Sequence, residues 1–540
     1  MASGVQAIGD LAVVLHAHLP YVHSSEPGSL EEDWYFQALL ECYLPLLDVL
    51  ETAAADPAQR PRLSMGLSPT LLSLLSNRAL SERFGPWLAV RQELLLQAPS
   101  GFEAASEDLA ALLNRAARAW QRCNGNLLPR FQRLQQAGVL DLLTCAATHG
   151  YLPLLRDNPE AVRAQLLTAV REHQRLLGVR PQGIWLPECA YYEGLDQLLV
   201  SCGLRYAILD AHGLLHGQPR PRYGVYAPIC TPAGMAFFGR DSESTLPVWS
   251  ARDGYPGDAS YREFHRDLGW DLPEDELESR GIGCRRPLGL KLHRVSGQQC
   301  ELHAKQAYEP AAAAACSQRD AAHYLQGRRS HLQHLAGAME RRPLLVAPFD
   351  AELFGHWWYE GPQFLAQLFR QADQQGVGLV TLRESLSRGD SLQLCAPSPS
   401  SWGQGGYHNY WLNDSNAWVI PEWHRASRAM VQRVSRGVGS EAARELLNQA
   451  GRELLLAQSS DWSFILRAGT TTELARERIE RHLGRFWRLL AAIDGGEPLP
   501  VGWLEAVKAE DGLFPLLNAA DWAQLPQAPS SSGIPAAGQA

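Results

Sequence analysis

The chain has 540 residues, more than one hydrophobic core covers, so we expect two or more packed units. Hydrophobic residues make up 46% of it and charged residues 20%, as in an ordinary soluble globular protein. The formal net charge of −9 argues against nucleic acid or an anionic membrane as the main partner.

The cysteines and the N-terminal residues indicate the compartment. The 10 cysteines are scattered without a C-x-x-C pair, which is typical of reduced thiols and predicts a cytoplasmic protein. The first residues lack the basic start and long apolar run of a signal peptide. No stretch approaches the ~20 apolar residues that would span a bilayer, so we expect no membrane partner.

Short apolar runs, each followed by a polar residue, recur along the first 390 residues or so. The runs are LAVVL before His16, RLSMGL before Ser68, LLTCAAT before His149, GIWLP before Glu188, RYAIL before Asp210, LLVAPF before Asp350 and VGLVTL before Arg383. Helical patterns separate them, as between buried parallel strands joined by crossovers. These runs favour a seven-stranded β/α barrel over an open sheet, and barrels of this kind place functional residues at the C-terminal ends of strands.

Two insertions and a C-terminal region complete the predicted organisation. Within a barrel part over 1–395, residues 80–135 have helical periodicity, whereas residues 212–300 are loop-rich and include a candidate cover for the site at 230–260. A Pro/Ser/Gly-rich boundary follows near residue 400, and amphipathic patterns predict a helical domain over 400–523. The last residues, 524–540, are predicted to be disordered.

Histidines follow two of the predicted strands. His16 and His18 are two residues apart, so a strand directs both side chains the same way. With His149 and Asp350 they could form a metal site, as in many barrel hydrolases, or their imidazoles could hydrogen-bond substrate hydroxyls. One of them could instead be a structural histidine that is buried in the core with its hydrogen bonds made there. The residue types alone leave these alternatives open.

Two carboxylates stand in aromatic surroundings. Glu188 precedes Tyr191 and Tyr192, and Asp350 lies in APFDAELFGHWWYEGP. A partly desolvated carboxyl group favours its neutral form, as a general acid requires, while an ionised Glu188 could attack an anomeric carbon. Carboxylates about 5 Å apart in these roles suffice for retaining glycoside chemistry. Acidic residues at strand ends also cap helices, so this alternative stays open as well.

Six segments carry a family resemblance. They are HAHLPYV, GLSPTLL, CAATHGYLPLL, GIWLPECAYYEGLDQLL, APFDAELFGHWWYEGP and SSDWSF, in this order. Together they resemble glycoside hydrolase family 57, and within it the 1,4-α-glucan branching enzymes. The resemblance implies a distorted (β/α)7 barrel with an inserted loop-rich subdomain and a C-terminal helical domain. It also implies a retaining transfer of an α-1,4-glucan segment to a 6-hydroxyl, as in glycogen synthesis.

The resemblance also implies which residues form the site. Glu188 matches the nucleophile and Asp350 the acid/base, with α-glucan as donor and acceptor and with neither metal nor cofactor. Substrate contacts are expected at His16, His18, His149, Arg266, Gly283, Trp357, Trp402, Trp411 and Asp461. The family usually carries a glutamine in a TGQ-like context beyond that aspartate, where this chain has Thr470 in RAGTTTELA.

Other functions remain possible on the sequence. A relative within the family could be an α-amylase or a 4-α-glucanotransferase. A metal-dependent barrel hydrolase built on HAH and a catalytically silent glucan-binding protein belong to different classes. We expect a monomer.

Overall fold

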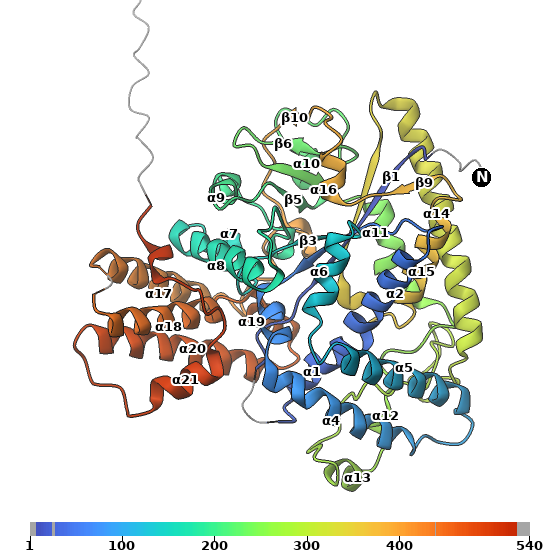
Figure 1. Ribbon diagram of the computed structural model, residues 1–540, viewed down its shortest axis with the longest axis horizontal. Coiled ribbons are helices and arrows are strands. Elements are labelled where there is room, and N and C mark those ends of the chain that lie inside the picture. The colour runs from blue at the N-terminus through green and yellow to red at the C-terminus, as the bar shows by residue number, and fades with distance from the viewer. Residues whose placement is uncertain (1–6, 24–26, 438, 526–540) are drawn as a thin grey trace, which may run out of the picture.

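The computed structural model describes residues 7–23, 27–437 and 439–525. A body of strands and helices makes up most of the molecule, and a group of C-terminal helices lies at one side of it (Figure 1). The predicted disordered tail falls almost entirely on residues 526–540, which lie outside the described residues.

Seven parallel strands among the described residues form a distorted ring. Strands β8, β1, β2 and β3 pair in that order, and so do β4, β5 and β7. A bridge from Thr144 to Ile184 joins the two groups, and the N–H of Asp241 donates to Val346 O, 2.8 Å away, where the second group returns to the first. The strands are β1 Gly9–Ala17, β2 Leu63–Leu67, β3 Leu140–Leu143, β4 Gly183–Ile184, β5 Tyr206–Leu209, β7 Ala236–Gly239 and β8 Leu344–Asp350. This ring is the predicted (β/α)7 barrel.

One ring strand differs from the sequence prediction. The run VGLVTL forms β9 (Val377–Leu379), which pairs only with Gly9–Leu11 at the start of β1. The seventh ring strand, β7, comes instead from the segment expected to be loop-rich. Its four residues, AFFG, lie in a stretch rich in Gly, Pro and Arg and without clear periodicity, so we expected a loop there.

The barrel strands are buried along their length and end in polar residues. All nine residues of β1 are buried, which explains its continuous apolar run. Because the ring strands are parallel, their C-terminal ends meet at one mouth. The side chains that follow the strands there are His18, Ser68, His149, Glu188, Asp210, Arg240 and Asp350.

Helices surround the ring and fill the first insertion. Helices α4 to α6 occupy the stretch for which the sequence predicts a helical insertion. The helices around the barrel are α1 Leu30–Ala38, α2 Leu44–Ala55, α3 Pro69–Leu75, α4 Arg78–Leu95, α5 Glu103–Arg122, α6 Leu128–Gln136, α7 Leu152–Leu155, α8 Pro159–Leu177, α9 Leu195–Ser201, α14 Pro310–Ala338, α15 Gly361–Gln371 and α16 Leu382–Leu386. A π-helical turn, Leu39–Tyr43, joins α1 to α2.

The segment 212–300 is partly built into the barrel wall. It contributes β6 (Ile229–Cys230), which pairs with β7 and with β10 (Gln393–Leu394), and helices α10 Ala211–Leu215, α11 Ser242–Trp249, α12 Leu268–Asp271 and α13 Glu274–Glu278. Trp249 of α11 contacts Phe349 of β8, with ring centroids 6.4 Å apart. Much of the expected cover, 230–260, is therefore strand and packed helix rather than a free loop.

The C-terminal helices follow the amphipathic patterns of the sequence. They are α17 Val419–Ser435, α18 Glu441–Ala457, α19 Ser460–Ala468, α20 Thr472–Ile493 and α21 Trp503–Asp511. Their apolar faces bury Trp423, Leu454 and Phe486 in a shared core. Helix α19 reaches from this group toward the barrel mouth.

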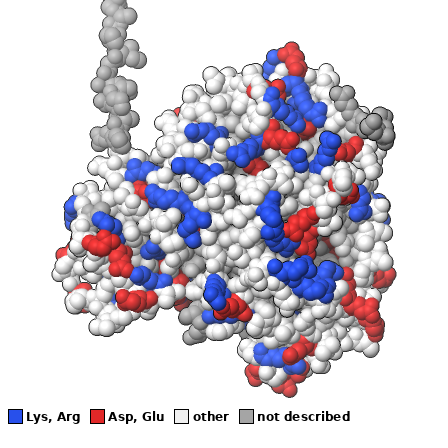
Figure 2. Space-filling model, viewed as in Figure 1, with Lys and Arg blue, Asp and Glu red and all other residues white. Residues whose placement is uncertain are grey.

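Surface charge and helix hydropathy agree with the composition. On the face that Figure 2 shows, basic and acidic side chains are interspersed. No helix among the described residues combines the length and the apolar character needed to cross a membrane.

Candidate active site

Glu188 and Trp402 form a fixed pair at the end of β4. Glu188 lies in the left-handed backbone region, with φ of 61°, within a short 3-10 turn, Pro187–Cys189. Trp402 donates its Nε1–H to Oε2 of Glu188 over 2.7 Å and its backbone N–H to the Glu188 carbonyl over 3.0 Å. Burial raises the pKa of Glu188 to about 7, and the hydrogen bond from Trp402 opposes that rise. The side chain of Glu188 is thus held in place, and its pKa lies near neutral pH.

Asp350 lies at the end of β8, across the mouth from β4. Its backbone is paired in register with His16 of β1. Burial raises the pKa of Asp350 well above its usual value, and the charges of Glu352 and Glu188 raise it further, while Arg240 opposes the shift. The protonated form of Asp350 is therefore favoured, and the two carboxylates are near enough to act on each other.

Glu352 is a third carboxyl group at the mouth, and we did not expect it as a site residue. Its Oε1 accepts a hydrogen bond from the Tyr43 hydroxyl over 2.5 Å and another from the backbone N–H of His18 over 3.1 Å. Burial raises the pKa of Glu352 to about 7. The segment DAEL, which places two acidic residues two positions apart after a strand, was the sequence feature that could have indicated Glu352.

The π-helical turn Leu39–Tyr43 supports the segment that carries these acids. Besides the hydroxyl of Tyr43, the Cys42 thiol donates to the carbonyl of Ala351 over 3.0 Å. A Cβ on Gly355 would lie 1.8 Å from the carbonyl oxygen of Glu41, so the two backbones touch. π-helical turns are rare and often mark functional sites. We therefore interpret this turn as a structural support that holds the loop after β8 in position.

His16, His18 and His149 lie together with nearly parallel rings. The rings of His18 and His149 are 4.0 Å apart, and His16 stacks on Trp185 at 4.7 Å. Nε2 of His149 lies 3.1 Å from Nε2 of His16, and its Nδ1 lies 2.8 Å from the Ser460 hydroxyl. Residues of the segments HAHLPYV, CAATHGYLPLL and SSDWSF therefore lie next to one another in the structure.

The three imidazoles differ in charge. Burial lowers the pKa of His16 and of His149 well below the usual value, so both rings are neutral. Burial also acts to lower the pKa of His18, but the Asp461 carboxylate outweighs it and raises that pKa. Both carboxylate oxygens of Asp461 lie 3.1 Å from Nε2 of His18, so among the three imidazoles it is His18 whose protonated form is favoured.

The proton positions in the neutral pair follow from packing. Nδ1 of His16 has no hydrogen-bond partner within the described ranges, and it faces Gly66, where a Cβ would lie 2.8 Å away. We therefore assign the His16 proton to Nε2, from which it is donated to His149. His149 then carries its own proton on Nδ1, toward Ser460.

Asp461 and Ser460 come from helix α19, far from the barrel in sequence. Burial acts to raise the pKa of Asp461, but His18 and the Ser459 hydroxyl hold it at about 2. The backbone N–H of Ser460 also donates to the His149 carbonyl over 3.2 Å. The C-terminal helices thus supply two side chains to the barrel mouth.

Some groups here have the residue types of a metal site. His16, Cys145 and His149 bring potential ligand atoms within 4.8 Å of one another, and so do His18, His149 and Asp461. In the second group the atoms already serve the ion pair with His18, whose raised pKa disfavours the neutral imidazole that a cation needs. The second group is therefore better suited to hydrogen bonding than to holding a cation.

The remaining expected substrate contacts, Trp357, Trp411, Arg266 and Gly283, differ in exposure and in the residues that they contact. The ring of Trp357 is 56% exposed and stacks on Phe264 at 4.6 Å. Trp411 is buried against Tyr151, with centroids 4.5 Å apart. Arg266 pairs with Asp271 over 3.1 Å, and no described contact joins it to the mouth. Gly283 is exposed, with open space around it, so the structure does not bring it or Arg266 to the carboxylates.

Arg240 is a further residue that we did not expect at the mouth. It follows β7, and its Nη1 donates to a carboxylate oxygen of Asp210 over 3.2 Å. Its charge favours the ionised form of Asp350. It was missed because β7 itself was not recognised.

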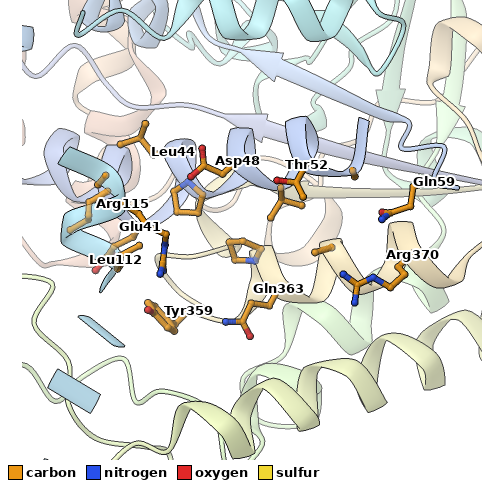
Figure 3. Close-up of a pocket in the computed structure, with 17 residues that line it drawn as sticks. Glu41, Leu44, Asp48, Thr52, Gln59, Leu112, Arg115, Tyr359, Gln363 and Arg370 are labelled. Atoms are coloured by element: carbon orange, nitrogen blue, oxygen red, sulfur yellow. The ribbon is translucent and has the colours of Figure 1, made fainter. Parts of the chain in front are cut away.

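A pocket of about 270 Å³ opens outside the barrel, between α2 and α15, with α5 at one end (Figure 3). Glu41 and Tyr359 lie at the end near α5, and Asp48, Gln363 and Arg370 also line it. None of the expected site residues lines it. The pocket therefore does not belong to the carboxylate centre.

Comparison with known proteins agrees with this geometry. Residues 12–394 match the model of glycosyl hydrolase family 57, and residues 422–522 match that of the 1,4-alpha-glucan branching enzyme C-terminal region. A 1,4-alpha-glucan branching enzyme of Thermococcus kodakarensis is 30% identical over 514 residues, which cover 89% of this chain and 73% of that protein.

Solved structures give the same family from the fold. An α-amylase of Thermotoga maritima, AmyC, has 34% sequence identity and a TM-score of 0.88, with 96% of this chain and 99% of that chain covered. A GH57-type branching enzyme of Pyrococcus horikoshii has 30% identity and a TM-score of 0.87, with 97% and 98% covered. With its barrel matched over most of the chain, this protein belongs to glycosyl hydrolase family 57.

Proposed function

We propose that this chain is a retaining 1,4-α-glucan branching enzyme. The observation that carries the proposal is the contact of α19 with the barrel mouth. Ser460 and Asp461 lie in the part that matches the branching-enzyme C-terminal model, and they bind His149 and His18 beside the carboxylates. A site completed in this way fits an enzyme of that class.

The first proposed step forms a covalent glycosyl-enzyme. Asp350, protonated, donates its proton to the leaving glycosidic oxygen while the Glu188 carboxylate attacks the anomeric carbon. The raised pKa of Asp350 supports its role as the acid. Burial raises the pKa of Glu188 to about 7, so its ionised form, which a nucleophile requires, is available near neutral pH.

The second proposed step transfers the glucan. Asp350, now ionised, takes the proton of a 6-hydroxyl on another glucan chain, which attacks the anomeric carbon with net retention. An α-1,6 linkage forms and Glu188 is released. Cationic His18 and neutral His16 and His149 are proposed to hold hydroxyls of the reacting sugar, with Trp402, Trp411 and Trp357 as aromatic contacts.

Hydrolysis of the same intermediate by water is the second candidate function. The similarity to the Thermotoga maritima α-amylase favours it, since that structure covers nearly the whole chain at 34% identity. The first step is common to both reactions. The two differ in whether water or a sugar hydroxyl reaches the intermediate.

Incubation of the purified protein with amylose tests the proposal. A branching enzyme generates new α-1,6 linkages, visible by proton NMR, with few new reducing ends. An α-amylase generates reducing ends without such linkages, and a 4-α-glucanotransferase redistributes chain lengths without either. Loss of activity with a chelator, and its return with added metal, would instead support the metal-dependent hydrolase.

We further propose a cytoplasmic monomer acting in glycogen-like metabolism. All ten cysteines are free thiols in the structure, which supports a reducing compartment. Size-exclusion chromatography with light scattering tests the monomer.

A further inference from the structure

Aromatic side chains of the C-terminal part lie exposed beside the site. Phe464 of α19 is 44% exposed, and the half-buried Tyr410 packs against it with ring centroids 4.6 Å apart. Exposed apolar groups that pack together in this way are candidates for a binding surface. We call these two residues the Tyr410–Phe464 platform.

The two backbone segments that carry the platform are tied together. The fully buried side chain of Asn416 donates from Nδ2 to the carbonyl of Tyr410 and to that of Ser463, both over 3.1 Å. One amide thus ties the loop that carries Tyr410 to the helix that carries Phe464. A surface fixed in advance loses little conformational entropy when a ligand binds.

The platform is continuous with the carboxylate centre on two sides. Phe464 lies three residues beyond Asp461 on α19, so it is on the same side of the helix and about 4.5 Å further along its axis. Tyr410 packs against the cluster of Tyr151, Ala190 and Trp411, and Ala190 is two residues from Glu188. A chain running out of the site along α19 would meet the two rings.

We propose that the Tyr410–Phe464 platform binds an α-glucan strand beyond the sugars that react. The inference rests on the proposed function, which makes an α-glucan the ligand. The flat C–H faces of sugar rings pack on aromatic rings, and the platform offers such a surface with no charge on it. Its role is to select long chains over short ones.

Substrate length gives the test. Phe464→Ala is expected to raise KM for amylose roughly threefold to tenfold, as expected when one aromatic contact is lost. Its KM for the shortest maltooligosaccharide that the enzyme uses, and its kcat on both substrates, are expected to stay unchanged. Phe464→Tyr keeps a flat ring and is expected to restore the KM for amylose. Tyr410→Ala should act in the same direction.

A matched control separates the platform from loss of any exposed apolar residue. Leu516 is 53% exposed in the same C-terminal region, and Leu516→Ala is expected to change neither KM. Thermal unfolding of each variant checks that the fold is intact. An unchanged KM for amylose in Phe464→Ala, or an equal rise for short and long substrates, would overturn the proposal.

The readout also separates this proposal from the proposed function. The conversion of amylose and the formation of α-1,6 linkages are measured independently. A wild-type protein that consumes glucan without forming these linkages overturns branching, and the length dependence of its KM still decides the role of the platform.

Discussion

Glu188 has a backbone conformation that few residues other than glycine adopt, with φ of 61°, and Cys189 follows at 50°. Such conformations cost about 1–3 kcal/mol each and persist where the surroundings impose them. Here Trp402 holds the Glu188 carboxylate and the Glu188 carbonyl together. The turn and Trp402 together fix the position of this carboxylate at the barrel mouth.

Replacing Glu188 by glutamine tests the nucleophile. Glu188→Gln keeps the shape and can still accept from Trp402, but an amide does not attack an anomeric carbon. We expect kcat to fall by at least roughly 10³-fold on amylose. The melting temperature should stay within a few degrees, and substantial remaining activity would contradict the assignment.

Removing the hydrogen bond of Trp402 tests how the charge of Glu188 is set. Activity requires ionised Glu188 and protonated Asp350, so kcat/KM rises with pH as Glu188, whose pKa is about 7, loses its proton. Trp402→Phe removes the hydrogen bond that opposes the effect of burial, so the pKa of Glu188 rises further. The rise of kcat/KM with pH therefore shifts to higher pH. The loss in kcat/KM should therefore be larger at about pH 6 than at about pH 8. A uniform loss at every pH would indicate a packing role only.

At the scale of elements, the pairing of β1 with β2 sets where His16 lies. His16 is in register with Gly66, and the ring lies over the glycine. A Cβ at position 66 would come within 2.8 Å of Nδ1 of His16 and 3.3 Å of Cβ of Trp185. Only glycine leaves room for the stacked imidazole.

Gly66→Ala is accordingly expected to move the His16 ring and break its contact with His149. We expect kcat/KM to fall by roughly tenfold, with a loss of about 1–3 kcal/mol in the free energy of unfolding from overpacking. The measurements are glucan consumption and denaturant unfolding. Gly85→Ala, on α4 with open space around it, is the matched control; it should leave kcat/KM unchanged and raise the free energy of unfolding by about 0.5–1 kcal/mol through helix propensity. An unaltered kcat/KM in Gly66→Ala would show that the His16 position is not needed.

The elements divide into those that the sequence predicted and those that it did not. Strand β1 contains the predicted run LAVVL, and helices α17, α18 and α20 lie within 400–523, where amphipathic patterns predict a helical domain. β7 was missed because its Gly- and Pro-rich surroundings are typical of loops, and VGLVTL was assigned to the ring because its composition suits any buried strand. Local pattern does not say which strand pairs with which.

At the scale of the molecule, the helical region and the barrel are joined through charge as well as packing. Asp461 keeps His18 protonated, so a helix more than 400 positions later in the chain sets the charge on a barrel histidine. The site is incomplete without these helices. This explains why two adjacent family models both bear on one centre.

Asp461→Asn tests that coupling. Without the carboxylate, burial lowers the pKa of His18, and the imidazole loses its proton near neutral pH. We expect kcat/KM to fall roughly 10- to 100-fold, the size of a lost charged hydrogen bond, and NMR titration to show a lower His18 pKa. Asp494→Asn is the control, since Asp494 pairs with Arg433 in the same helical region and is 48% exposed. Equal effects of the two changes would rule out a specific role for Asp461.

The sequence by itself determined the family, the barrel class, the helical C-terminal region and the candidate acids. These follow from apolar runs, periodicity and contiguous motifs such as APFDAELFGHWWYEGP, which are properties of neighbouring residues. Only the tertiary structure decided that Tyr43, Arg240 and Ser460 join the site, that His18 is the charged histidine, and that Arg266 and Gly283 lie apart from the carboxylates. The physical reason is that charge state and contact depend on burial and on partners brought together across the chain, which local pattern does not record.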